Sequence, residues 1–156
     1  MKKVGIIIPT MNRSEFIERQ LLYYASLKSK HPIYIGDASD QDHRKKIESC
    51  IEKLGSQITV HFNHWPDHND RQAIKRLAEL VEEEYIAFIG DDDFFVPSGL
   101  NKCADFLSKN SDYRTAQGVS TLFSLQSDGV YGEFNKLRKY WTNPEAIDEN
   151  GKERLL

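Results

Sequence analysis

Short apolar runs alternate along the chain with stretches in which apolar residues recur every three or four positions. The runs at residues 4–8, 32–36, 57–62 and 85–90 are short and rich in β-branched or aromatic residues, which predicts four strands. The stretches that follow them predict four amphipathic helices. Their inward stripes are expected at Phe16, Ile17, Leu21, Tyr24 and Ala25; at Ile47, Cys50, Ile51 and Leu54; at Ala73, Ile74, Leu77, Ala78 and Val81; and at Leu100, Cys103, Ala104 and Leu107. This alternation predicts an α/β fold, with a mostly parallel, twisted sheet flanked by helices on both faces.

Local signals predict where several of these elements begin and end. Pro9 is expected to end the first strand, because proline cannot donate a backbone hydrogen bond. Asn12, with Glu15 three positions later, predicts a capping box at the start of the first helix. Gly55 is expected to end the second helix, and Pro97 to begin the fourth.

The pattern changes after residue 112. Residues 113–125 favour β structure, residues 127–129 are a hairpin turn signal, and residues 130–134 can return antiparallel, which together predict a mixed β region. Residues 144–156 have the composition of a helix start, without a stop signal. We therefore expect one domain over residues 1–156, which forms the N-terminal portion of a longer protein.

Composition excludes several classes of function. The chain has 156 residues, and its 21 basic and 24 acidic residues give a net charge of −3, which argues against a nucleic-acid partner. Cys50 and Cys103 lie in helical patterns without metal-ligand spacing, which favours buried thiols in a reducing compartment over a disulfide. No segment has the apolar length of a signal peptide or a membrane span, so we expect a cytoplasmic protein.

Three consecutive carboxylates follow the fourth predicted strand. Asp91, Asp92 and Asp93 would repel one another at the end of a buried strand unless a cation or several N–H donors compensate them. Oxygen ligands of this kind suit Mg²⁺ or Mn²⁺, which usually complete their coordination with water and substrate phosphates. A solvated acidic turn that caps the next helix is the alternative. The position favours a site, because ligands of open α/β sheets bind beyond the carboxyl ends of the strands.

The turn after the first strand carries a second group of polar side chains. Thr10, Asn12 and Arg13 offer a hydroxyl, an amide and a guanidinium beside a helix N-terminus, which suits a nucleotide and its phosphates. Helix capping is an equally good interpretation of Asn12. Arg71 and Lys75 lie near the start of the third helix, where basic residues are usually solvated.

The third predicted strand is followed by a loop rich in histidine. His61, His64 and His68, with Trp65 among them, have a spacing that fits no standard zinc site. We interpret these residues as a mobile loop near the site, with Trp65 as a packing anchor.

Three segments together resemble glycosyltransferase family 2, the inverting enzymes with the Rossmann-like GT-A fold of nucleotide-diphospho-sugar transferases. They are IIIPTMNR at residues 6–13, IGDASD at residues 35–40 and YIAFIGDDDFFVPSGL at residues 85–100. Their order and spacing match, and the resemblance covers about the first two thirds of the chain. It implies that residues 1–112 are the nucleotide-binding half, and that residues 113–156 begin the acceptor-side half.

The resemblance also implies roles for individual residues. Residues 9–13 would contact the donor through Pro9, Thr10, Asn12 and Arg13, and Asp37 matches the family acid that hydrogen-bonds the uracil or similar base. Arg71 and Lys75 lie where family members often place polar contacts to the nucleotide. Ser39 and Asp40 are expected to cap the following helix instead.

The third motif departs from the usual family wording at one position. An aspartate usually stands where this chain has Gly90, and a small residue where it has Asp91. Asp92 would hold the ribose or the metal, and Asp93 would bind the cation that bridges the diphosphate. Asp91 can substitute for the acid missing at Gly90, so we expect Asp91 and Asp93 to be the metal ligands.

The function implied is transfer of a sugar from a nucleotide-diphosphate sugar, expected to be a UDP-sugar, to an unknown hydroxyl acceptor with inversion. Mn²⁺ or Mg²⁺ would neutralise the departing diphosphate. No carboxylate matches the family's general base, which we expect beyond Leu156. Two alternatives are a catalytically incomplete nucleotide-sugar-binding module and a metal-dependent phosphohydrolase. Strand one ends in Pro9 and Thr10, without the nucleophilic aspartate that such a hydrolase needs.

Overall fold

A computed structural model describes residues 2–127 and 129–139 of the chain. It divides into two compact units, residues 1–116 and residues 117–156. The elements of the first unit are β1 (Val4–Thr10), α1 (Ser14–Ser26), β2 (Ile33–Asp37), α2 (Gln41–Leu54), the short 3₁₀ helix η1 (Gly55–Gln57), β3 (Val60–His64), α3 (Asp70–Leu80), β4 (Tyr85–Phe88) and α4 (Pro97–Lys109). The single-domain organisation expected from the sequence stays a prediction.

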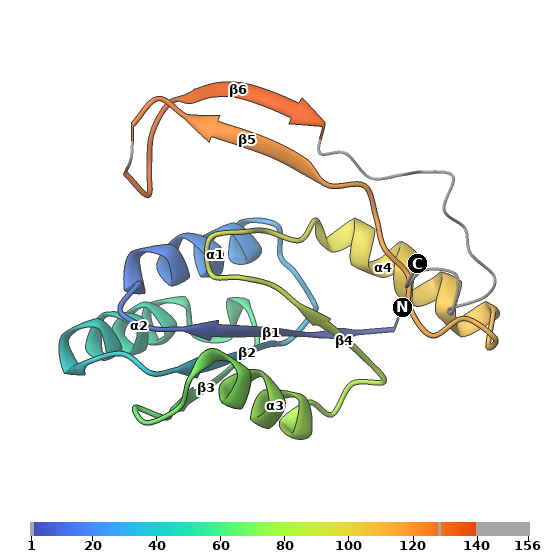
Figure 1. Ribbon diagram of the computed structural model, residues 1–156, viewed down its shortest axis with the longest axis horizontal. Coiled ribbons are helices and arrows are strands. Elements are labelled where there is room, and N and C mark those ends of the chain that lie inside the picture. The colour runs from blue at the N-terminus through green and yellow to red at the C-terminus, as the bar shows by residue number, and fades with distance from the viewer. Residues whose placement is uncertain (1, 128, 140–156) are drawn as a thin grey trace. The chain divides into compact units, whose positions relative to one another are not determined.

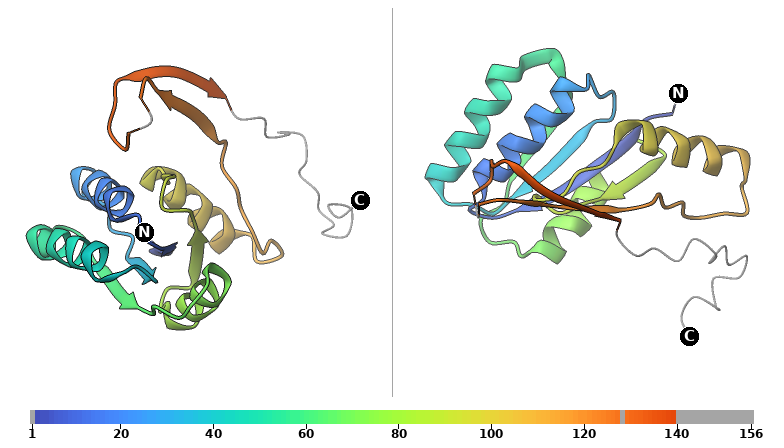
Figure 2. Two further views of the ribbon diagram at one scale, coloured as in Figure 1. Left: turned by 60° about the vertical axis from the view of Figure 1, so that its left-hand side comes forward. Right: turned by 90° about the horizontal axis from the view of Figure 1, so that it is seen from above.

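The four strands of the first unit form one parallel sheet in the order β3-β2-β1-β4 (Figure 1). Alternating residues of β1 face opposite sides of this sheet. Ile6 and Ile8 belong to the larger core, which α1, α2 and α4 cover. Ile7 lies on the other face with Tyr34 and Leu77, where α3 packs. The predicted α/β fold is confirmed, and Figure 2 shows the helices on both sides of the sheet.

The first strand continues through Pro9 to Thr10, so the expectation that Pro9 ends it is wrong. The ladder between β1 and β4 ends at the pair Ile7–Phe88, and Ile89 donates the last backbone hydrogen bond, to Ile7. The N–H groups of β1 at odd positions point toward β4, and β4 has already ended beside position 9. Pro9 therefore lacks an N–H where no strand would have accepted its hydrogen bond. The pairing with β2 meanwhile continues to the last residue of the strand, Thr10, opposite Asp37.

The second unit contains a two-stranded antiparallel sheet of β5 (Thr121–Leu125) and β6 (Phe134–Lys139). A small antiparallel sheet here agrees with the predicted mixed β region, although its strands differ from those expected. Residues 113–120 are not strand, and the returning strand begins at Phe134 instead of occupying residues 130–134. The helix start predicted at residues 144–156 lies outside the described residues. None of the described helices is long and apolar enough to cross a membrane.

Buried His31 joins the beginning of β1 to the beginning of α4. Its Nδ1 accepts a hydrogen bond from the Val4 N–H at 3.0 Å, so its Nε2 carries the proton and donates to the Pro97 carbonyl at 3.3 Å. Burial lowers the pKa of His31, although its hydrogen bonds with Pro97 and Asn101 oppose that effect. The neutral imidazole thereby fixes one end of the segment that follows β4.

We expect the protein to lose stability through His31 as the pH falls below the ordinary histidine pKa of 6.5. The unfolded chain takes up a proton there while the folded chain does not, so the free energy of unfolding falls by at most about 1.4 kcal/mol per pH unit. The loss continues down to the lowered pKa of the folded state. Urea unfolding between pH 7.5 and 5 should show a weaker pH dependence for His31→Gln, while NMR titration of the native protein reads the histidine directly. A His31 pKa at or above 6.5 would contradict this assignment.

Candidate functional site

The carboxyl ends of β1 and β4 meet at the point where the order of strands reverses, because β1 lies between β2 and β4 in the sheet. Ligands of open α/β sheets bind at such a point. Thr10, the last residue of β1, donates a hydrogen bond from Oγ1 to Asp91 Oδ2 at 2.8 Å. A hydroxyl and a carboxylate that are far apart in sequence therefore join the two strand ends.

Asp91, Asp92 and Asp93 form an acidic turn after β4, and Arg13 neutralises part of its charge. Its Nη1 lies 2.7 Å from Asp91 Oδ1 and its Nη2 lies 3.2 Å from Asp92 Oδ2. The guanidinium also lies over the ring of Phe16, 4.1 Å from its centroid. Both oxygens of Asp91 are thus engaged, one by Thr10 and one by Arg13. Sequence reasoning selected these four polar residues for a site, and the structure brings them together.

Asp91 is buried, with only 5% of its surface exposed. Burial raises the pKa of its carboxyl group, while the Thr10 hydrogen bond and the Arg13 charge lower it and the neighbouring Asp92 charge raises it further. Burial is the largest of these effects. The ionised carboxylate therefore depends on Thr10 and Arg13 for its place in the fold.

The inner face of α1 holds the backbone of the acidic turn. Gln20, which is fully buried, donates from Nε2 to the carbonyls of Gly90 at 2.8 Å and Asp93 at 2.5 Å. Tyr24 accepts the Phe95 N–H at its hydroxyl at 3.0 Å, and burial raises the pKa of that phenol to about 12. Sequence reasoning missed Gln20. The signal available was a polar residue within the apolar stripe of the first predicted helix.

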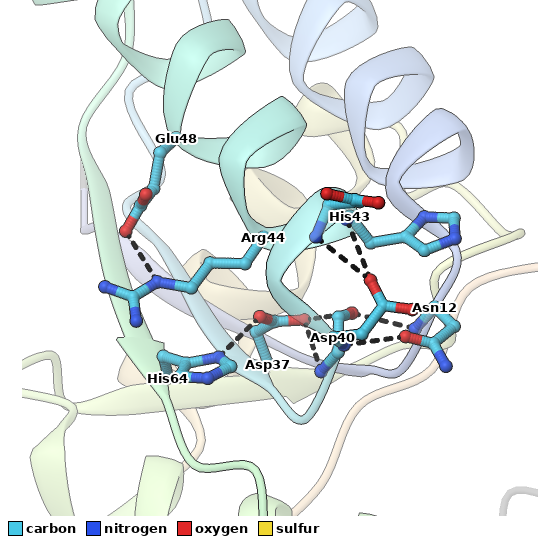
Figure 3. Close-up of polar contacts among 9 residues, drawn as sticks. Asn12, Asp37, Asp40, His43, Arg44, Glu48 and His64 are labelled. Atoms are coloured by element: carbon cyan, nitrogen blue, oxygen red, sulfur yellow. Dashed lines mark hydrogen bonds and ion pairs between the residues drawn. The ribbon is translucent and has the colours of Figure 1, made fainter.

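Asp37, at the end of β2, is completely buried. Its Oδ1 accepts hydrogen bonds from the N–H and the hydroxyl of Ser39, and its Oδ2 lies 2.9 Å from Nδ1 of His64, the last residue of β3. Figure 3 shows the contact between Asp37 and His64. Ser39 therefore does not cap α2 as expected, because its hydroxyl is turned to Asp37, whereas the expected cap at Asp40 is confirmed.

Asn12 connects the loop after β1 to the loop after β2. Its N–H donates to Ser39 Oγ at 2.8 Å, and its side-chain Oδ1 accepts the Asp40 N–H at 2.8 Å (Figure 3). The capping role predicted for Asn12 is wrong: α1 begins at Ser14, its N-cap is Arg13, and no side chain caps it. Asn12 has a φ of 54°, a left-handed conformation that asparagine tolerates better than most residues, and this turns its amide toward the second loop.

The remaining candidates lie apart from this network. Arg71 and Lys75 are exposed on α3, and among the described residues neither side chain forms an ion pair or hydrogen bond with the other candidates. The expectation of a mobile histidine loop is wrong for His61 and His64, which are residues of β3. Trp65 packs beside Leu77, as expected of an anchor, and stacks on His68.

The acidic turn offers a divalent cation few protein ligands. Within residues 2–127 and 129–139, no group of three or more acidic, histidine or cysteine side chains is placed to hold a metal ion. Asp92 and Asp93 are exposed, while Asp91 is buried and paired. One or two exposed carboxylates do fit the way Mg²⁺ is usually bound, because substrate phosphates and water supply its other ligands.

We expect Arg13→Gln to lower the free energy of unfolding at pH 7 by about 1–3 kcal/mol, because it leaves the buried Asp91 carboxylate with Thr10 alone. The same change in an Asp91→Asn background should cost less than about 1 kcal/mol. A double-mutant cycle in urea measures the difference. Arg44→Gln is the matched control, since its ion pair with Glu48 is exposed within one helix and should contribute about 0.5 kcal/mol at most. If Arg13→Gln lowers the free energy of unfolding equally in both backgrounds, the proposed dependence of the Asp91 carboxylate on Arg13 is contradicted.

The fold of this chain is similar to that of several solved structures. A crystal structure of S. aureus TarS is 19% identical, with a TM-score of 0.56 over 69% of this chain and 20% of that one. TarS 1–349 gives 20% identity and a TM-score of 0.57 over 70% and 33%. The mannosyltransferase PcManGT from Pyrobaculum calidifontis, in complex with GDP-Man and Mn²⁺, gives 15% identity and a TM-score of 0.58 over 69% and 32%.

These likenesses show the GT-A fold, and the chain spans only a fifth to a third of the length of these structures. The comparison with curated protein sequences gave no significant match. The family model for glycosyl transferase family 2 matches residues 5–148, which is most of the chain. The chain therefore belongs to glycosyl transferase family 2.

Proposed function

We propose that this chain binds the donor of a glycosyltransferase, which transfers a sugar from a nucleotide-diphosphate sugar to a hydroxyl acceptor. One observation carries the proposal: Thr10, Arg13 and Asp91 meet at the carboxyl ends of β1 and β4 in a chain of this family. Positive and hydrogen-bonding groups there suit a diphosphate.

The diphosphate end of the donor would lie against Arg13 and the acidic turn. Asp93 is the carboxylate best placed to hold a divalent cation, since its side chain is exposed and, unlike that of Asp92, is not paired with Arg13. Asp91 can join it only when Arg13 turns away. When bound, Mn²⁺ or Mg²⁺ would stabilise the negative charge of the leaving nucleoside diphosphate. The PcManGT complex contains Mn²⁺, which supports metal use in this family.

The nucleoside would extend from the acidic turn toward β2. Thr10 is the register partner of Asp37 as well as the hydrogen-bond donor to Asp91, so the end of β2 and the acidic turn adjoin the same residue. Pro9 and Asn12 belong to the same strand end and loop, and Asp92 would face the ribose. We propose a UDP-sugar as the donor, with Arg71 and Lys75 as outer contacts to phosphate.

The transfer would proceed with inversion, assisted by a general base that takes the proton of the acceptor hydroxyl. No residue of the described part is assigned to that role. A catalytically incomplete binding module would have the same donor geometry, so nucleotide binding and sugar transfer have to be measured separately. The strand end that would carry the nucleophile of a phosphohydrolase holds Pro9 and Thr10.

We expect the chain to bind UDP in the presence of Mn²⁺, and Asp93→Asn to weaken that binding about tenfold or more because it removes a cation ligand. Isothermal titration with UDP, GDP and ADP, each with Mn²⁺ or with EDTA, measures the effect. In EDTA the native chain and the variant should bind equally weakly. Asp105→Asn, an exposed aspartate of α4, is the matched control and should leave binding unchanged. Nucleotide affinity that is the same with Mn²⁺ and with EDTA would contradict the proposed metal site.

A further inference from the structure

The buried carboxylate of Asp37 has little left to offer a ligand. It is 0% exposed, one oxygen accepts two hydrogen bonds from Ser39, and the other faces His64. A nucleobase could reach this carboxylate only if the side chains that cover it moved, and moving His64 would take a partner from the buried Oδ2. A buried polar group that loses its partner costs more than a hydrogen bond normally contributes, so direct contact is unfavourable.

His64 extends this carboxylate outward. Its Nδ1 faces Asp37 Oδ2, which can only accept, so Nδ1 carries a proton. When the imidazole holds only that one proton, Nε2 presents a lone pair. The His64 side chain keeps 19% of its surface exposed, and no described residue forms a hydrogen bond with Nε2. Figure 3 shows His64 reaching Asp37 from the neighbouring strand.

The place of His64 in the sheet indicates which part of a donor it could meet. β3 lies three strands away from β4 in the order β3-β2-β1-β4, so roughly 14 Å separates His64 from the strand that leads into the acidic turn. A general base at the transferred sugar must lie within hydrogen-bond reach of the acceptor, beside the diphosphate. His64 is too far from the acidic turn for that role, but it lies beside Asp37 at the base end of the nucleotide.

We propose that His64, and not Asp37, contacts the nucleobase, with Nε2 accepting the ring N–H of a base in which a carbonyl adjoins that N–H, as in uracil or guanine. Asp37 is the positioning residue, since its carboxylate fixes the tautomer and orientation of the imidazole. This assignment rests on the proposed donor site and adds the residue that selects the base.

The test compares UDP with 3-methyl-UDP, which lacks the ring N–H, in titrations with Mg²⁺. The native chain should bind UDP about tenfold more tightly than the methylated nucleotide. His64→Phe keeps a ring but removes the acceptor, and should weaken UDP binding by a similar factor, while His64→Gln, which keeps a carbonyl acceptor, should retain more affinity. His61→Gln on the same strand is the control. GDP and 1-methyl-GDP form the corresponding pair for guanine.

Imidazole ¹⁵N spectra of the native chain test the same assignment without a substitution. Nε2 should be unprotonated in the free chain, and its resonance should move when UDP and Mg²⁺ are added. A protonated Nε2 with an unprotonated Nδ1, or an unmoved signal at saturating UDP, would overturn the proposal even if His64→Phe failed to fold. Normal UDP binding by a folded His64→Phe would overturn it while leaving the donor site intact. Absence of any nucleotide binding by the native chain would overturn both.

Discussion

A buried carboxylate at the junction of two strands is the constraint on which the site depends. Asp91 is held at the end of β4 only because a hydroxyl from β1 and a guanidinium from the following turn approach it. Burial alone raises the pKa of this group, and its partners oppose that effect. The sequence must therefore supply Thr10 and Arg13 at fixed positions, and these groups are also suited to a phosphate ligand.

The end of β1 connects the acidic turn to Asp37 and its partners Ser39 and His64. Thr10 contacts Asp91 with its side chain and pairs with Asp37 in the β1–β2 ladder. Two positions later, Asn12 connects its loop to Ser39 and Asp40. A change in the loop after β1 would thus alter both proposed ends of the donor site. Gln20 separately holds the acidic turn to α1.

The sequence predicted the elements better than it predicted the partners. Apolar periodicity is local, so it identified the four parallel strands, the four helices and the polar residues at the ends of β1 and β4. The partners of those residues are determined by tertiary contacts: Thr10 and Asp91 are 81 positions apart, and Asp37 and His64 are 27 apart. Asparagine is a good N-cap, which favours a cap at Asn12 as much as a ligand contact, but its left-handed backbone turns its side chain to a distant loop. Burial of Asp37 beneath His64 had no local signal.

Charge balance connects the free state of the site with its proposed use. Arg13 forms ion pairs with Asp91 and Asp92 but not with the exposed Asp93. The turn therefore keeps negative charge, which favours a divalent cation. A cation near Asp93 would weaken the hold of the carboxylates on Arg13, and an incoming diphosphate would attract the same guanidinium. Under the proposed function, metal and donor would therefore bind cooperatively, since each lowers the cost of moving Arg13. The buried contact between Thr10 and Asp91 would keep the strand ends together while the cation and Arg13 rearrange.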